Sequence, residues 1–95
     1  MQFWVQIEPK ELARFLELSG DKNPLHYQGL ELIPGNLLML KLQQYLEKQG
    51  QEITKIVMDF IKPVYLGQPI MFKVEMQTFQ VLTTDEKLLA KGRWQ

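Results

Sequence analysis

Apolar and polar residues alternate through the second half of the chain. A period of two is typical of antiparallel strands that bury one face. It covers residues 53–60, 72–77 and 88–94. Phe79 and Val81 fall out of phase with the apolar positions before them, which predicts a bulge or break near Thr78 and a further strand over 78–83. The second half is therefore expected to form several strands of one sheet.

The first half of the chain predicts one short strand and two helices. Residues 3–7 alternate between apolar and polar and are expected to form the strand. The first helix is expected to begin at Pro9 and stop at Gly20, because Pro is tolerated in a first turn and Gly commonly ends a helix. The second helix covers residues 36–49. Its first turn, 37–40, is apolar on every side and is expected to be buried all round.

The two helices are separated by residues 20–36, which are rich in Gly and Pro and predict a long loop. Loops of this length inside compact domains are commonly functional. The helix over 36–49 is the only long apolar element able to cover the sheet. The pattern therefore predicts an α+β fold in a single domain over 1–95, with an antiparallel sheet of five strands wrapped around a central helix.

Charge and composition exclude several classes of protein. The chain has 11 basic and 11 acidic residues, a balance that argues against a dedicated nucleic-acid binder or a polybasic membrane anchor. It has no Cys, and no apolar run approaches the roughly 20 residues of a membrane span. The N-terminus lacks the pattern of a signal peptide, so a cytoplasmic location is expected. A domain of 95 residues buries a modest share of its surface, which favours self-association.

Candidate chemistry is concentrated in residues 15–26, which contain the only His of the chain. Asp21 and His26 lie five positions apart across an Asn-Pro turn, and a carboxylate and an imidazole within reach of one water form a minimal acid/base pair. The same residues are also ordinary helix-stop and turn residues, in which Asp21 and Asn23 bond nearby backbone. Spacing alone leaves both interpretations open and favours the second.

The order of residues in this segment closely resembles the hydratase signature of the MaoC-like dehydratases, which include the (R)-specific enoyl-CoA hydratases. The signature begins with an aromatic residue, here Phe15, and ends with Gly-Asp-Lys-Asn-Pro-Leu-His at 20–26. Two further segments resemble the family: Pro34-Gly35 before an apolar helix, and the run from Phe60 through Pro63-Val64 to Gly67. The resemblance implies the hotdog fold, an antiparallel sheet wrapped around one long helix, here in a chain shorter than usual.

The resemblance also implies a reaction, the interconversion of trans-2-enoyl and (R)-3-hydroxyacyl thioesters of CoA or acyl carrier protein. Asp21 and His26 would be the catalytic pair that activates water, and the unperturbed pKa of an imidazole, about 6.5, suits this task. The backbone N–H of Gly35 would stabilise the enolate oxygen at the start of the central helix. Asn23 would support the loop, although an ordinary turn role is equally open. Neither a cofactor nor a metal is expected.

The chain departs from the family pattern at two positions near these residues. Family members usually have His where this chain has Pro34, and often an acidic or small residue where it has Gln28. Pro34 bears on the geometry around Gly35, and the shortened chain bears on the depth of the acyl pocket. Two alternative functions follow: a hotdog that binds acyl thioesters or a protein partner without efficient catalysis, or a hotdog thioesterase.

Four residues are candidates for the substrate pocket: Tyr27, Leu37, Met39 and Phe60. Each is also explained by core packing, and for Leu37 and Met39 this is the better explanation. The expected partners are the acyl thioester substrate and a second copy of the chain. In the family two sheets join edge to edge, which suits a small neutral domain with exposed strand edges. Nucleic acid and membranes are not expected partners.

Overall fold

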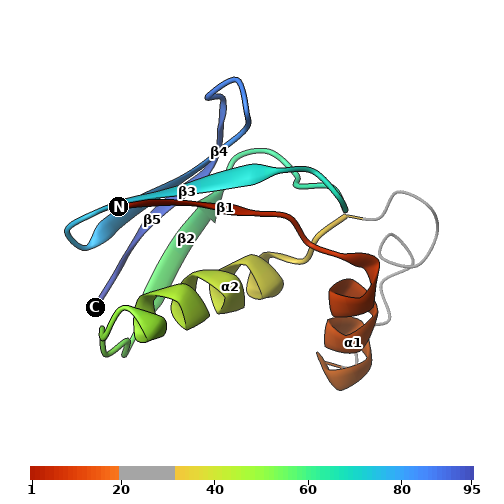
Figure 1. The fold of residues 1–95 in the computed structure, drawn as a ribbon, viewed down its shortest axis with the longest axis horizontal. Helices are drawn as coiled ribbons and strands as arrows, with labels where there is room; N and C mark the ends of the chain where they lie inside the picture. The colour runs from red at the N-terminus through yellow and green to blue at the C-terminus, as the bar shows by residue number, and fades with distance from the viewer. Residues whose placement is uncertain (20–31) are drawn as a thin grey trace.

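The computed structural model describes residues 1–19 and 32–95, which contain two helices and five strands. Their order along the chain is β1 (Gln2–Val5), α1 (Pro9–Ser19), α2 (Gly35–Lys48), β2 (Ile56–Phe60), β3 (Ile70–Glu75), β4 (Thr78–Leu82) and β5 (Leu88–Trp94). Figure 1 shows α2 running along one face of the sheet, with α1 beside the N-terminal end of α2. The α+β architecture predicted from the hydrophobic pattern is confirmed.

The five strands form one antiparallel sheet in the order β1-β3-β4-β5-β2. The register places Phe72 of β3, Val81 of β4 and Ala90 of β5 in one row, and each is fully buried. Paired residues of neighbouring strands share a face, so this row defines the inner face that packs on α2. The edge strands are β1 and β2.

Helix α2 packs on the inner face through one apolar stripe. Leu38, Leu42 and Leu46 are four residues apart and at most 1% exposed. Full burial of each of these side chains stabilises the fold by about 1.5–3 kcal/mol. Tyr45 extends the contact to β1, because its ring stacks on Phe3 with ring centroids 3.5 Å apart.

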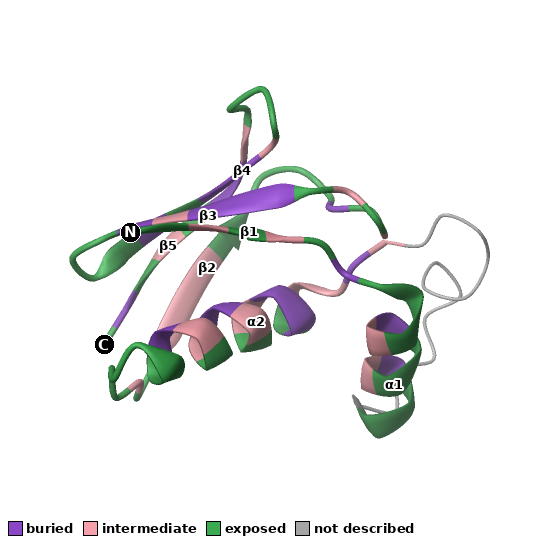
Figure 2. Ribbon diagram, in the orientation of Figure 1, coloured by how far each residue is buried: buried purple, intermediate pink, exposed green. Residues whose placement is uncertain are grey.

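The prediction that the first turn of α2 is buried on every side is wrong. Leu37 and Leu38 are buried, but Met39 is half-buried and Leu40 is 39% exposed. Figure 2 shows the reason: α2 is covered by the sheet along one side, and its opposite side is exposed. A helix at the surface of a two-layer fold has one covered face, whatever the hydrophobicity of its other positions.

The break predicted near Thr78 is a hairpin turn. Strand β3 ends at Glu75 and β4 begins at Thr78, with Met76 at φ 53° in the turn. The Thr78 hydroxyl donates to the Glu75 carbonyl over 2.9 Å, which closes the turn. A register shift also occurs between Val81 and Leu82, which the sequence pattern did not indicate.

Helix α1 is held against the rest of the fold by its apolar face and by one ion pair. Leu12 and Leu16 are buried in the core. Glu11 pairs with Lys41 of α2, and both side chains are partly buried. These contacts hold α1, which ends at Ser19, against the core and α2.

Candidate active site

The N-terminus of α2 provides free backbone donors. Leu37 and Leu38 N–H donate to the Pro34 carbonyl over 3.0 and 3.4 Å, whereas within residues 1–19 and 32–95 the Gly35 and Asn36 N–H groups have no backbone acceptor. Pro34 is extended, at φ −61° and ψ 140°, and makes no side-chain cap. The first turn of α2 carries no acidic residue. The positive end of the helix dipole and two N–H groups therefore remain available to an anion or an oxyanion.

These donors open onto a cleft of about 530 Å³. Its walls are the segment before α2, the first turn of α2 and the segment that follows β2. The lining residues are Leu32, Ile33, Pro34, Gly35, Asn36, Leu38, Phe60, Ile61, Lys62, Pro63 and Val64. The two outer walls are joined by a hydrogen bond of 2.8 Å from Ile33 N–H to the Val64 carbonyl, and by the bridge between Leu32 and Tyr65. The cleft is thus mostly apolar, and its lining includes Gly35 and Asn36, which carry the two donors.

Gly35 and Phe60, distant in the sequence, meet in this cleft. Phe60 ends β2, is 51% exposed, and turns its ring toward the first residue of α2. A Cβ added to Gly35 would lie 2.8 Å from Phe60 Cε2 and closer still to Cζ. Only glycine fits beneath the ring without displacing it. The structure therefore brings together two of the residues that the sequence suggested for the site.

The other described candidates lie elsewhere on α2. Leu37 is 3% exposed and belongs to the core, and Met39 is half-buried. Neither lines the cleft of Gly35 and Phe60. Their assignment to a substrate pocket gains no geometric support from this cleft.

Asp21, Asn23, His26 and Tyr27 lie outside the described residues, and their roles remain predictions. In the sequence they lie between two described residues. One is Ser19 at the end of α1, and the other is Leu32, whose bridge to Tyr65 places it in the wall of the cleft.

The cleft contains polar residues that the sequence analysis did not single out. Asn36 follows Gly35 and offers a second free N–H group, and exposed Lys62 lies on the opposite wall. The only hint in the sequence was the position of these two residues. Lys62 is inside the family-like segment that begins at Phe60, and Asn36 is next to Gly35, the predicted oxyanion donor. Spacing alone could not show that these two segments face each other.

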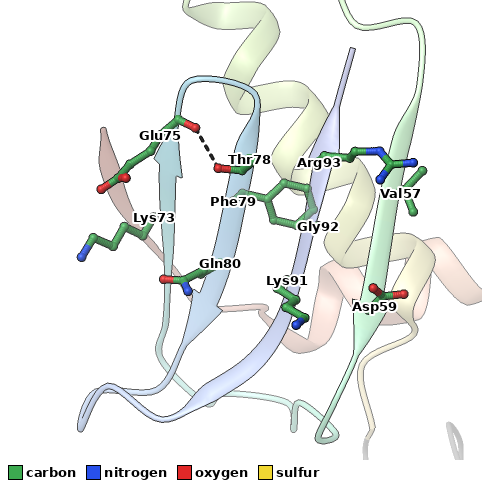
Figure 3. A pocket seen from close by; sticks show the side chains of 10 residues that line it. All are labelled: Val57, Asp59, Lys73, Glu75, Thr78, Phe79, Gln80, Lys91, Gly92 and Arg93. Carbon is green, nitrogen blue, oxygen red and sulfur yellow. Dashed lines mark hydrogen bonds between the residues drawn. The ribbon is translucent and has the colours of Figure 1, made fainter.

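A second cleft, of about 460 Å³, lies on the outer face of the sheet. Figure 3 shows the residues that line it, in front of the helices; among them Phe79 is buried in the core. Three cations and two carboxylates line it: Lys73, Lys91, Arg93, Asp59 and Glu75. Charges of both signs are mixed on this face, as on a solvated sheet face. The described part of the chain has no group of three or more potential metal ligands, and none of its helices is long and apolar enough to cross a membrane.

Comparison with solved structures identifies the fold of this chain. The chain aligns over 99% of its length with the (R)-hydratase from A. caviae involved in PHA biosynthesis, covering 89% of that chain at a TM-score of 0.80 and 22% identity. The R-hydratase PhaJ1 from Pseudomonas aeruginosa matches over 99% of this chain and 76% of its own, at a TM-score of 0.77 and 17% identity. The dehydratase heterocomplex ApeI:P from Xenorhabdus doucetiae matches over 99% of this chain and 83% of its own, at a TM-score of 0.70 and 16% identity.

The hotdog fold implied by the sequence resemblance is therefore confirmed, in a chain shorter than the structures it matches. No protein-family model matches the chain, and no curated protein matches its sequence. At these identities the likeness establishes the fold, and catalytic chemistry has to be argued from the residues.

Proposed function

We propose that this chain, which has the hotdog fold of the (R)-hydratases, interconverts trans-2-enoyl and (R)-3-hydroxyacyl thioesters of CoA or acyl carrier protein. The observation that carries the proposal is the position of Gly35 at the start of α2: it lines an apolar cleft, and its N–H group has no backbone acceptor in the part of the chain that the structure describes. The hydratase-like segment ending in Gly-Asp-Lys-Asn-Pro-Leu-His precedes this helix in the sequence. An oxyanion donor and an acid/base pair are the two elements that the reaction needs.

In the proposed mechanism, water adds across the C2–C3 double bond of the enoyl thioester. Asp21 and His26 hold the water and take one of its protons while its oxygen bonds to C3. The electron pair of the double bond moves toward the thioester, and the resulting enolate oxygen accepts a hydrogen bond from Gly35 N–H. A proton returned to C2 completes the 3-hydroxyacyl product, and dehydration follows the same steps in reverse. Asn23 supports the loop, and Tyr27 and Phe60 contact the acyl group.

A homodimer is part of the same proposal. Among residues 1–19 and 32–95, the outer edge of β2 has no strand partner, and Ile56, Val57 and Met58 on it are half-buried. Unpaired edges with apolar side chains are ready surfaces for a second strand. Joining two β2 edges about a twofold axis would continue the sheet and bring the two clefts to the interface.

The test is an assay of crotonyl-CoA hydration. Hydration is monitored through the loss of the enoyl absorbance, and free thiol is measured in parallel. Hydration without thiol release supports the proposal. Thiol release without hydration favours a thioesterase, and a folded protein inert toward enoyl and 3-hydroxyacyl thioesters favours a binding protein without efficient catalysis. Sedimentation of the same sample tests the dimer.

A further inference from the structure

We infer that Phe60 is a positioning residue, the wall against which the planar thioester lies when its carbonyl oxygen accepts the hydrogen bond from Gly35. This inference rests on the proposed function. It adds a distinct role to an aromatic side chain that neither the core nor the acid/base pair accounts for.

The first argument is the placement of the ring. Phe60 shares the inner-face row of Ala90, which is fully buried, yet Phe60 itself is 51% exposed. It is the last residue of the edge strand, and its ring lies against Gly35, the first residue of α2. An inward-facing aromatic residue with half of its surface open contributes less to the core than its size allows.

The second argument is rigidity. The chain directly after Phe60 is fixed by two hydrogen bonds, from Ile61 N–H and Lys62 N–H to the Leu89 carbonyl, over 2.9 and 3.1 Å. On the other side of the cleft, Gly35 is held at the start of a helix whose Leu38 is 1% exposed. Both the ring and the donor are thus presented by anchored backbone.

The third argument is contact. The ring lies so close to Gly35 that it fills the space a Cβ would take. The ring therefore lies beside the residue whose N–H would bind the thioester oxygen, and a flat conjugated enoyl thioester can pack along it. Holding a substrate in one orientation contributes to kcat as well as to binding, and a displacement of about 1 Å costs up to about a hundredfold in rate.

The experiment compares Phe60→Leu and Phe60→Tyr with the wild type in crotonyl-CoA hydration. Trp4→Leu is the matched control, because Trp4 is 59% exposed and lies on the outer face of β1, away from the cleft. We expect Phe60→Leu to lower kcat by about tenfold or more, with a smaller change in KM. Phe60→Tyr, which restores the flat ring, should recover most of kcat, and Trp4→Leu should match the wild type.

Two further measurements separate positioning from folding and assembly. Thermal unfolding and sedimentation of Phe60→Leu should match the wild type, because the ring is half exposed. The amide resonance of Gly35 should shift on addition of crotonyl-CoA to the wild type, and shift less in Phe60→Leu.

The outcomes distinguish this inference from the proposed function. An active wild type whose kcat is unchanged in Phe60→Leu overturns the positioning role alone. Loss of activity explained by unfolding or dissociation of Phe60→Leu, with no recovery in Phe60→Tyr, also overturns it. A wild type inert toward enoyl thioesters, with no shift of the Gly35 amide, overturns both.

Discussion

The ring of Phe79 lies against Gly92 on the neighbouring strand, and it fills the space beside a residue that has no side chain. A Cβ at Gly92 would lie 2.7 Å from Phe79 Cζ and would overlap the Val57 carbonyl of β2. The strands β4, β5 and β2 can approach as closely as they do because position 92 is glycine.

Gly92→Ala should therefore destabilise the fold. Because the clash on one side is with backbone, we expect a loss of about 1–3 kcal/mol in the free energy of unfolding. Urea denaturation measures it. Lys91→Ala, at an exposed position of the same strand, is the control and should change stability by less than about 0.5 kcal/mol. A Gly92→Ala variant as stable as the wild type would show that the close approach is not needed.

The stacked rings of Phe3 and Tyr45 should couple β1 to α2. The Phe3 ring lies between Tyr45 and Phe72, with centroids 3.5 and 5.0 Å away. A double-mutant cycle with Phe3→Leu and Tyr45→Leu should give a coupling of about 0.5–1.5 kcal/mol. Strict additivity of the two substitutions would mean that the rings contribute by burial alone.

The ion pair of Glu11 and Lys41 should contribute modestly to the docking of α1. Both side chains are partly exposed, so Glu11→Gln is expected to cost about 0.5–1 kcal/mol of stability. Because salt screens such pairs, the difference from the wild type should shrink at about 1 M NaCl. A penalty independent of salt would point to packing of the side-chain stems instead.

The turn between β4 and β5 should add a pH-dependent term to stability. Asp85 accepts a hydrogen bond from the Thr83 hydroxyl, which lowers the pKa of its carboxyl group below 3.8; its own backbone N–H and Lys87 act in the same direction. A carboxyl group whose pKa is lower in the folded state stabilises the fold at pH values above its pKa in the unfolded state. This stabilisation is lost as the pH falls through the pKa in the folded state. Asp85→Asn should thus be less stable than the wild type at pH 7, and the two should converge at acid pH. A difference that persists unchanged at acid pH would contradict this account.

Local patterns predicted the elements of the fold well, and failed where the outcome depended on neighbours. Residues 72–76 alternate cleanly, so β3 was predictable. The phase change at Phe79 marked the turn between β3 and β4. The exposure of Leu40 could not be predicted, because hydrophobicity does not say how many sides of a helix the fold covers. The register shift at Val81 is likewise set by pairing between strands.

The same distinction applies to the candidate site. Gly35 and Phe60 were each suggested by family-like segments, but their contact depends on how the end of β2 meets the start of α2. No periodicity within either segment encodes that meeting. Asp21 and His26 rest on the order of residues in one segment, and their test is chemical.

The most direct test of the central claim is the rate of crotonyl-CoA hydration by the wild type and by Asp21→Asn and His26→Ala, with Trp4→Leu as the control. General acid/base catalysis contributes about 10²- to 10⁴-fold, so each substitution should reduce kcat by about that factor while circular dichroism remains that of the wild type. The control should keep the full rate. Wild-type rates in both Asp21→Asn and His26→Ala would contradict the account, because the proposed acid/base pair would then have no part in the chemistry.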